Sequence, residues 1–438
     1  MSRSIQESAA RTQPPEQRSF SPSALRQSAG ITHRRIRSWR VLWRWGRWVT
    51  LFILLGLNAT WYWQETRPLV DLITIDRWID QQRLEAAEQA LQARLVRSPH
   101  DGDSRARLAK IYGLRQDMLA CAEQLRKIPF WWPEKGKWSL MEGTAYKQVD
   151  RLADAERAWL AVVEDDPLHP IDQRFVTAAV MDLLELYATE SRWADAARLI
   201  WSIYDRTEDA HDREALLVMR MRTELERIMP SVAADKLRRY LTADPQDWEA
   251  RRALAKAAVA MNAPDEAKRQ LEQCLRERPE DPRGWADFLT ILADLGDLEA
   301  LRQAMDRLPE GIADHPEIAK HRAQLLERDR RWVEAVKLYQ RVIQVRPWER
   351  DVYYRLSLLE DRLGHSDTAR EYRQRSEAMR VARSELNEAF QKVLDLRRDH
   401  PEGSPRLDEA FHRLAQICQT LGWTRDADGW ASLARSSP

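Results

Sequence analysis

Glycine and cysteine are both scarce in this sequence, and each scarcity excludes a class of fold. Only 14 of the 438 residues are glycine, and no Asn-Gly or Asp-Gly pair lies between two alternating apolar runs. β-Hairpins favour such pairs, so the sequence predicts an all-helical chain. The three cysteines, Cys121, Cys274 and Cys418, form no CxxC pair. We therefore expect neither a disulfide framework nor a zinc site, and we interpret each cysteine as a small apolar residue on a helix face.

Motifs of enzyme chemistry are missing as well. The nine histidines include no HExxH motif and no pair at metal-ligand spacing on one helix face. Neither glycine-rich phosphate loop, GxGxxG or GxxxxGK(S/T), occurs, and GxSxG is also absent. We therefore predict that the chain is not an enzyme and that it has no catalytic, cofactor-binding or metal-binding residues.

Charge is divided unevenly along the chain, although the formal net charge is only +1. Residues 1–47 carry ten arginines against Glu7 and Glu16, a net charge of +8, so the remaining 391 residues carry −7. A basic head on a mildly acidic body is not typical of a nucleic-acid-binding protein. We expect no nucleic-acid partner.

The N-terminal region changes composition abruptly at residue 34. Residues 1–33 are rich in Ser, Gln, Arg and Pro, which predicts a disordered, Arg-rich tail. Residues 34–66 combine a dense arginine cluster with the uncharged run 48–63, which as a helix would span about 24 Å of a hydrocarbon core of about 30 Å. Tryptophans at both ends of the run suit the two membrane interfaces. The predicted transmembrane helix is anchored by Trp48, Leu51, Phe52, Ile53, Leu54, Leu55, Leu57, Trp61 and Trp63.

Two other interpretations of this run stay open, a cleaved signal peptide and a buried helix of a soluble core. A signal peptide needs small residues at its cleavage site, whereas Asn58-Ala59-Thr60 leads directly into Trp-Tyr-Trp. A core helix would not follow so many arginines. If the run is a single-pass anchor, the arginine asymmetry places the N-terminus in the cytoplasm and the repeats outside it. The arginine cluster would then bind anionic lipid headgroups.

One stretch, Trp248–Pro279, shows the pattern that the rest of the chain repeats. Its small and apolar residues line one side of a first helix and the inner side of a second: Leu254, Ala255 and Ala258, then Ala267, Leu271 and Cys274. Pro264 fits the first turn of the second helix, and Pro279 ends it. Two such helices cannot bury their faces alone, so the copies must stack. The pattern and its period of 34 residues resemble the tetratricopeptide repeat.

Other parts of the chain repeat this spacing. Alanine precedes a large apolar residue by four positions in three pairs: Ala155 with Trp159, Ala267 with Leu271, and Ala335 with Tyr339. Ser231 is in position to cap a further helix. We predict an all-α chain with an α-solenoid of stacked antiparallel helix pairs, a tetratricopeptide-like superhelix, over residues 67–366.

The resemblance implies that the first helix of each pair faces a concave groove. The groove residues on that basis are Glu249, Arg252, Lys256, Glu317, Lys320, Gln324, Asp351 and Tyr354. Their mixed charges suggest binding of an extended segment or a helix, with solvated helix faces as the alternative. The family's clamp for a C-terminal carboxylate needs an Asn that is missing beside Arg252 and Lys256.

Two segments interrupt the repeats. The aromatic loop around Trp131 and Trp132 either presents an anchor to a partner or folds back between neighbouring repeats. The second segment is a long helix over Asp367–Arg398, which opens a C-terminal region of residues 367–438. Its apolar residues keep heptad spacing: Tyr372, Met379, Leu386 and Val393, with Ala382, Ala389 and Leu396. This seam predicts either a dimeric coiled coil or packing against the last helices as a cap.

These observations predict a non-catalytic, membrane-anchored scaffold that mediates protein–protein interactions in an envelope, secretion or complex-assembly process. The alternative is an accessory or regulatory subunit of an enzyme or of a larger permanent membrane complex.

Overall fold

The computed structural model describes residues 69–164, 171–400 and 404–436, which form twenty α-helices, one short 3-10 helix and no strand. The all-α prediction is confirmed for this part of the chain. The fold described below is that of the compact unit formed by residues 72–438. The predicted tail and transmembrane anchor lie outside the described residues. Among the helices that are described, none has the length and apolar character needed to cross a membrane.

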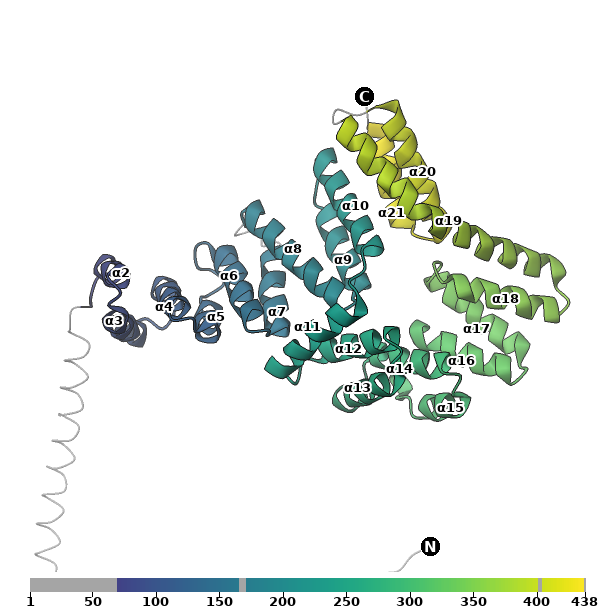
Figure 1. The fold of residues 1–438 in the computed structure, drawn as a ribbon, viewed down its shortest axis with the longest axis horizontal. Helices are drawn as coiled ribbons and strands as arrows, with labels where there is room; N and C mark the ends of the chain where they lie inside the picture. The colour runs from purple at the N-terminus through teal and green to yellow at the C-terminus, as the bar shows by residue number, and fades with distance from the viewer. Residues whose placement is uncertain (1–68, 165–170, 401–403, 437–438) are drawn as a thin grey trace, which may run out of the picture. The chain divides into compact units, whose positions relative to one another are not determined.

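The helices follow one another as antiparallel pairs (Figure 1). In chain order they are α2 (Leu72–Asp80), α3 (Leu84–Arg97), α4 (Gly102–Leu114), α5 (Met118–Arg126), α6 (Lys135–Gln148), α7 (Leu152–Val163), α8 (Gln173–Thr189), α9 (Trp193–Tyr204), α10 (Ala210–Leu225), α11 (Pro230–Ala243), α12 (Trp248–Ala260), α13 (Pro264–Glu277), α14 (Pro282–Asp294), α15 (Leu298–Asp306), η1 (Glu310–Ile312), α16 (Pro316–Arg328), α17 (Trp332–Val345), α18 (Arg350–Arg362), α19 (Ser366–Asp399), α20 (Pro405–Leu421) and α21 (Thr424–Ser436).

Local sequence signals explain where the helices begin. Proline occupies the first turn of α11, α13, α14, α16 and α20, where its missing N–H leaves no hydrogen bond unmade. Aspartate side chains cap other helices, as Asp247 does by accepting from the backbone N–H of Ala250. The predicted cap at Ser231 is wrong. Because Pro230 takes the first position of α11, Met229 is the N-cap residue and Ser231 lies inside the helix.

The turns within the pairs share one conformation. In nine pairs the residue two positions before the second helix has a positive φ: Gln82, Gln116, Asp150, Ser191, Asn262, Gly296, Arg330, Gly364 and Gly422. Glycine adopts this conformation without strain, whereas a side chain costs about 1 kcal/mol. At Gly422 space adds a second requirement, because a Cβ atom would lie 2.7 Å from the carbonyl oxygen of Pro347. The α20–α21 turn therefore packs directly against the α17–α18 loop.

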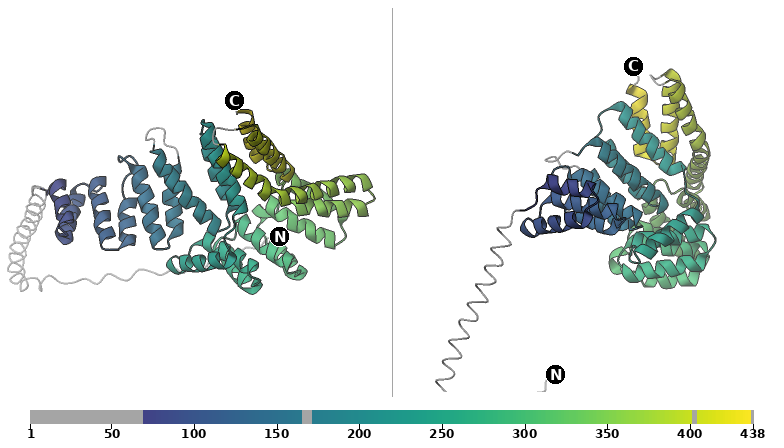
Figure 2. Two further views of the ribbon diagram at one scale, coloured as in Figure 1. Left: turned by 45° about the horizontal axis from the view of Figure 1, so that its top comes forward. Right: turned by 60° about the vertical axis from the view of Figure 1, so that its left-hand side comes forward.

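The apolar faces of the pairs meet in four clusters, of which three succeed one another along the solenoid and the fourth joins α9 and α10 to α19–α21. All six residues that define the predicted repeat at Trp248–Pro279 are buried. Neighbouring pairs stack with their helices roughly side by side, as the views in Figure 2 show. This arrangement confirms the solenoid of stacked helix pairs, since each pair completes its core only against the next.

The long helix α19 covers its heptad seam within the same chain. Met379, Ala382, Leu386 and Val393 are buried, and so is Phe390, which the heptad pattern did not include. From Ala382 onward these residues pack in one cluster with α20 and α21, where Phe411 stacks on Trp430 at 5.7 Å between ring centroids. The heptad seam of α19 is therefore covered, from Ala382 onward, by helices of the same chain.

Candidate functional site

The three C-terminal helices return to α9 and α10 and close the second half of the solenoid into a ring. Leu217 and Met221 of α10 are buried in the same apolar cluster as Trp430 and Leu433 of α21. Gly429 of α21 faces Leu217 so closely that a Cβ atom would lie 2.8 Å from Leu217 Cδ2. We call this contact of α9 and α10 with α19–α21 the closure seam. It joins residues that are 159 to 228 positions apart in the chain.

Ion pairs also cross the closure seam. Arg383 of α19 contacts Glu224 of α10 at 3.0 Å, and Arg220 of α10 lies 3.3 Å from Asp426 of α21. Arg425 pairs with Asp205 at 2.6 Å, and Arg397 pairs with Glu214. The seam thus combines buried apolar contacts, which supply most of the free energy, with charges that specify how the two sides meet.

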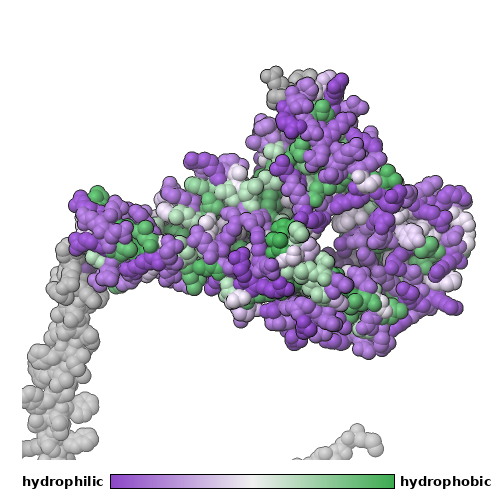
Figure 3. Space-filling view, viewed as in Figure 1, coloured by the Kyte–Doolittle hydropathy of each residue, from purple (hydrophilic) through white to green (hydrophobic). Residues whose placement is uncertain are grey.

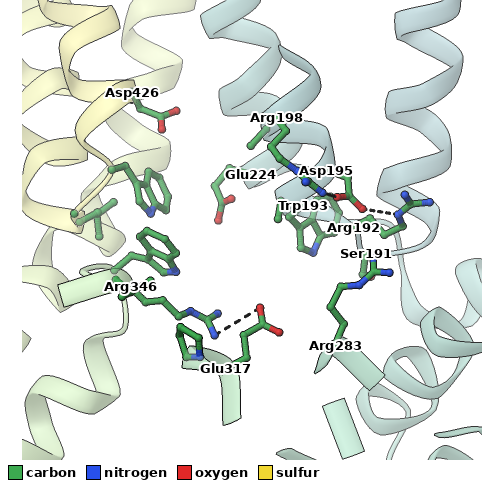
Figure 4. A pocket seen from close by; sticks show the side chains of 18 of the residues that line it. Ser191, Arg192, Trp193, Asp195, Arg198, Glu224, Arg283, Glu317, Arg346 and Asp426 are labelled. Carbon is green, nitrogen blue, oxygen red and sulfur yellow. Dashed lines mark hydrogen bonds and ion pairs between the residues drawn. The ribbon is translucent and has the colours of Figure 1, made fainter. Parts of the chain in front are cut away.

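The ring surrounds an open cavity of about 1660 Å³. Its wall is built by α9, α10, α12, the starts of α14 and α16, the α17–α18 loop, α19 and the α20–α21 turn. Labelled side chains from these elements, such as Asp195, Glu224, Arg283 and Arg346, converge on one space (Figure 4). A hollow is visible at this place on the molecular surface (Figure 3). We refer to it as the ring cavity.

Tryptophan and arginine side chains stack on one another along the wall. Arg227 lies over Trp193 at 4.0 Å from the ring centroid. Trp423 is approached by Arg383 at 5.5 Å and by Arg220 at 5.7 Å. Such cation–π contacts hold the guanidinium groups in place while leaving their N–H donors directed elsewhere. The wall therefore offers both apolar surface and oriented hydrogen-bond donors.

Basic side chains outnumber acidic ones in the lining. Eleven arginines and one lysine line the ring cavity against six aspartates and glutamates, an excess of six positive charges. Carboxylates just behind the wall offset part of this excess: Glu249 pairs with Arg283 at 2.8 Å, and Glu349 pairs with Arg346 at 3.0 Å. The groups nearest to a bound molecule are thus mainly guanidinium groups.

A buried charge network at the turn before α9 fixes one side of the cavity. Arg192 contacts Glu156 at 2.7 Å, Glu190 at 2.9 Å and Asp195 at 2.6 Å. Burial lowers the pKa of Arg192, but the hydrogen bond to Glu156 and the charge of Glu190 more than offset this and raise it overall. Burial raises the pKa of Glu190 to about 8, even beside Arg192. This network ties α7 and α8 to α9.

Glu317 of α16 lines the ring cavity, and so do two further predicted groove residues, Arg252 and Lys256 of α12. Both share Asp287 of α14, at 2.9 Å from Arg252 and 3.4 Å from Lys256. Arg252 is also paired with Glu249 and is buried. Burial lowers the pKa of Lys256, although the nearby Asp287 opposes this effect. These cations therefore join neighbouring repeats as well as facing the cavity.

Lys320, Gln324 and Tyr354, which were also predicted to face the groove, do not belong to the cavity lining. Lys320 pairs with Glu349 at 3.0 Å, and Gln324 hydrogen bonds to His321 at 3.2 Å. Tyr354 is 52% exposed. A partner-binding role for these three residues stays a prediction, but they do not share a site with Arg252 and Lys256.

The two tryptophans of the aromatic loop between α5 and α6 differ in their exposure to solvent. Trp132 packs against the apolar core, with its ring over Gly102 of α4. Trp131 is 51% exposed and contacts Phe130 edge to face at 4.9 Å between centroids. Trp132 thus folds back between repeats, whereas Trp131 is the residue available to a partner.

Residues of the closure seam that line the ring cavity could not be predicted from the sequence, above all Glu224, Arg227, Arg383 and Trp423. The family pattern assigns the groove to the first helix of each pair, and it treats the C-terminal helices only as a cap. Glu224 and Arg227 carry no periodic signal that links them to Arg383, because they meet it only when the ring closes.

Within residues 69–164, 171–400 and 404–436, no group of three or more His, Cys, Asp or Glu side chains is arranged to hold a metal ion. The three cysteines are buried thiols without a disulfide. Burial raises the pKa of Cys274 to about 12, so this thiol is protonated at neutral pH. That the chain is not an enzyme stays a prediction.

Comparison with solved structures finds repeat proteins that share small parts of this chain. MamA 41-end from Desulfovibrio magneticus RS-1 is 14% identical, covers 38% of this chain and 94% of its own, and has a TM-score of 0.30. MamA MSR-1 C2 is 17% identical over 38% of this chain and 98% of its own, with a TM-score of 0.28. YrrB, titled a TPR protein with an unusual peptide-binding site, is 18% identical over 39% of this chain and 86% of its own, with a TM-score of 0.27.

A search of the curated proteins found no match. The tetratricopeptide repeat model matches residues 229–286, which comprise α11, α12, α13 and the start of α14. These helices contribute the Arg252 and Lys256 wall of the ring cavity. The chain therefore contains a tetratricopeptide repeat segment within its helical solenoid.

Proposed function

We propose that this protein is a non-catalytic scaffold that binds a segment of a partner protein, helical or extended, in the ring cavity. The observation that carries the proposal is the open cavity of about 1660 Å³, which is lined by tryptophans and oriented arginines. Small-molecule pockets are mostly between about 300 and 1,000 Å³. An α-helix about 11 Å across with a 5.4 Å pitch fills roughly 500 Å³ per turn, so the cavity has room for about three turns.

We also propose that the scaffold is tethered to a membrane. The support comes from the sequence alone: the uncharged run 48–63, its flanking tryptophans, and the arginine cluster before it. In this arrangement the N-terminus lies in the cytoplasm and the repeats lie on the other side. Such a tether would present the ring cavity near the membrane surface, in an envelope, secretion or complex-assembly process.

The binding proposal is tested by filling the ring cavity without breaking an ion pair. Ala194 is exposed on α9 and lines the cavity, so Ala194→Trp places an indole inside it. Ala178 is equally exposed on α8 and does not line the cavity, which makes Ala178→Trp the matched control. Each full-length chain carries a C-terminal tag and is purified from gently solubilised membranes, and the co-purified proteins are identified by mass spectrometry.

We expect one partner to be retained by the unmodified chain and by Ala178→Trp, and to be lost from Ala194→Trp. A partner retained by all three chains would show that binding occurs outside the ring cavity, and the proposal would then be wrong. Recovery of the chain in the soluble fraction would overturn the membrane tether and leave the cavity experiment valid.

A further inference from the structure

Three arginines share two carboxylates where the closure seam meets the ring cavity. Glu224 is contacted by Arg227 at 3.1 Å, by Arg383 at 3.0 Å and by Arg220 at 3.5 Å. Asp426 adds one further contact, to Arg220 at 3.3 Å. All five residues line the cavity. We call this set the seam cluster, and its formal balance is three positive charges against two negative ones.

Burial differs sharply within the seam cluster. The side chains of Arg220, Glu224 and Asp426 are only 10%, 13% and 7% exposed, whereas those of Arg227 and Arg383 are each 44% exposed. The two carboxylates are thus at the back of the cluster, and two guanidinium groups are at the front. A guanidinium group has five N–H donors, so a single shared carboxylate leaves several of them available to a ligand.

The surroundings of Arg227 are consistent with an excess of positive charge. Burial lowers the pKa of Arg227; the charge of Glu224 opposes this, but Arg383 and Arg220 lower it further. An additional carboxylate between Arg227 and Arg383 would reduce this repulsion and would accept hydrogen bonds from both. The seam cluster therefore carries one formal positive charge that none of its own carboxylates balances.

Aromatic side chains frame the same position. Trp193 lies against Arg227, and Trp423 lies against Arg383 and Arg220. Both indoles are half-buried and line the cavity, so their remaining surface faces a bound molecule. A ligand with a carboxylate beside apolar groups would match this surface, since Trp and Arg are the side chains most often found at binding hot spots.

We infer that the partner segment is acidic and that one of its carboxylates binds between Arg227 and Arg383, with apolar side chains against Trp193 and Trp423. The inference rests on the proposed function, because it names the chemistry of the segment in the same cavity. A peptide suits the site better than a nucleic acid, because it can place one carboxylate at the two arginines and apolar groups elsewhere, whereas a nucleic acid carries a phosphate at every nucleotide and would bring several of them near the six carboxylates of the lining. Since Arg227 follows α10 and Arg383 belongs to α19, the bound carboxylate also bridges the closure seam.

The test uses the purified full chain and a random dodecapeptide library displayed on phage. Selections run in parallel on the unmodified chain, on Ala194→Trp, on Arg227→Gln/Arg383→Gln, and on Arg413→Gln. Arg413 is the matched control, because it forms one ion pair, to Glu385, and is 55% exposed, but it does not line the cavity. One enriched peptide is then synthesised, and its Kd is measured with each variant by fluorescence anisotropy, at low and at high salt.

We expect the unmodified chain and Arg413→Gln to enrich peptides rich in Asp and Glu, and Ala194→Trp to enrich none of them. Arg227→Gln/Arg383→Gln should weaken the selected peptide at least about tenfold, since two charged hydrogen-bond donors are lost. Affinity should fall as salt rises.

Other outcomes separate the inference from the proposed function. Neutral or basic peptides whose binding Ala194→Trp abolishes would overturn the acidic segment and leave the cavity as a protein-binding site. Enrichment that is identical on Ala194→Trp would overturn both. A 20-nucleotide poly-dT that displaces the selected acidic peptide at moderate salt would also refute the inference, because the cluster would then act as a general anion site.

Discussion

Closure of the ring depends on the close approach of Gly429 on α21 to Leu217 on α10, and adding a side chain at Gly429 should open the closure seam. A Cβ atom on Gly429 would lie 2.8 Å from Leu217 Cδ2, 3.2 Å from Leu217 Cδ1 and 3.5 Å from Trp201 Cη2. Leu217 is 1% exposed, so it has little room to move aside. We expect Gly429→Leu to push α21 away from α9 and α10 while each side keeps its own helices.

The size of the effect follows from the contacts at the seam. Crowding a packed site costs about 1–3 kcal/mol, which changes the ratio of closed to open rings by about 5- to 150-fold. The closed ring is favoured by the burial of Leu217 and Met221, which contributes about 1.5–3 kcal/mol for each side chain. The substitution therefore offsets a large part of the free energy that keeps the closure seam closed. The α19–α21 bundle should remain folded, because Phe390, Leu414 and Trp430 form a core of their own.

Pairs of spin labels can measure the opening directly. The three native cysteines are buried, so labels attach selectively at Arg222→Cys on α10 and Asp428→Cys on α21, both exposed positions. Double electron–electron resonance should report one short distance in the unmodified ring and an additional longer distance in Gly429→Leu. Peptide binding to the seam cluster should weaken in parallel, because opening separates Arg227 from Arg383.

The control compares the free energies of unfolding of two alanine variants, Gly113→Ala and Gly429→Ala. Ala is favoured over Gly in a helix by about 1 kcal/mol. Gly113 of α4 has only Cys121 Sγ near its Cβ position, at 4.0 Å, so Gly113→Ala should gain this amount. At Gly429 crowding should cancel the gain, and Gly429→Ala should leave the free energy of unfolding nearly unchanged. A single short distance in Gly429→Leu, with unaltered peptide binding, would refute the claim that this approach holds the ring closed.

Three further predictions concern the solenoid. Glu190→Gln should flatten the pH dependence of stability. The pKa of native Glu190 is raised from 4.5 to about 8, so between these values the native carboxyl binds more protons than the unfolded one, and the wild-type protein loses stability as pH rises through this window. Urea unfolding at pH 5 and pH 8 measures how the free energy of unfolding changes with pH in the wild-type protein and in the variant, and equal changes would contradict the assignment. Gly143→Ala should lower stability by about 1–3 kcal/mol, because its Cβ would lie 2.5 Å from Cδ1 of the buried Trp159; a rise in thermal midpoint would contradict this. Trp132→Ala should cost at least about 1 kcal/mol more in chemical unfolding than Trp131→Ala, because Trp132 packs on the core and Trp131 is 51% exposed; equal costs would show that the loop is not ordered in this way.

Most helix boundaries could be predicted, because the signals that define them are local. The long helix predicted over Asp367–Arg398 matches α19 to within one residue at each end, and Pro264 begins α13 as predicted. Here the apolar residues keep helical spacing, and turn residues flank them. Ser231 was wrong as a cap because two local signals competed, and the proline before it took the first helical position.

The candidate site was only partly predictable. Arg252 and Lys256 were identified because the repeat pattern assigns their helix to the inner face, and both line the cavity. Their shared partner Asp287 belongs to the next repeat and gave no signal of its own. Arg227 and Arg383 were missed because they are 156 residues apart in the chain and meet only around Glu224.

The sequence by itself determined that the described chain is helical, where its helices begin and end, and which faces they bury against their neighbours. These properties depend on spacings of three to thirty-four residues, over which periodicity, proline and capping residues act. Tertiary structure alone decided that the ring closes, that α21 meets α10 at Gly429, and that three arginines surround Glu224. Closure depends on small rotations summed over many stacked pairs and on the fit of two distant surfaces, and no local pattern records either quantity.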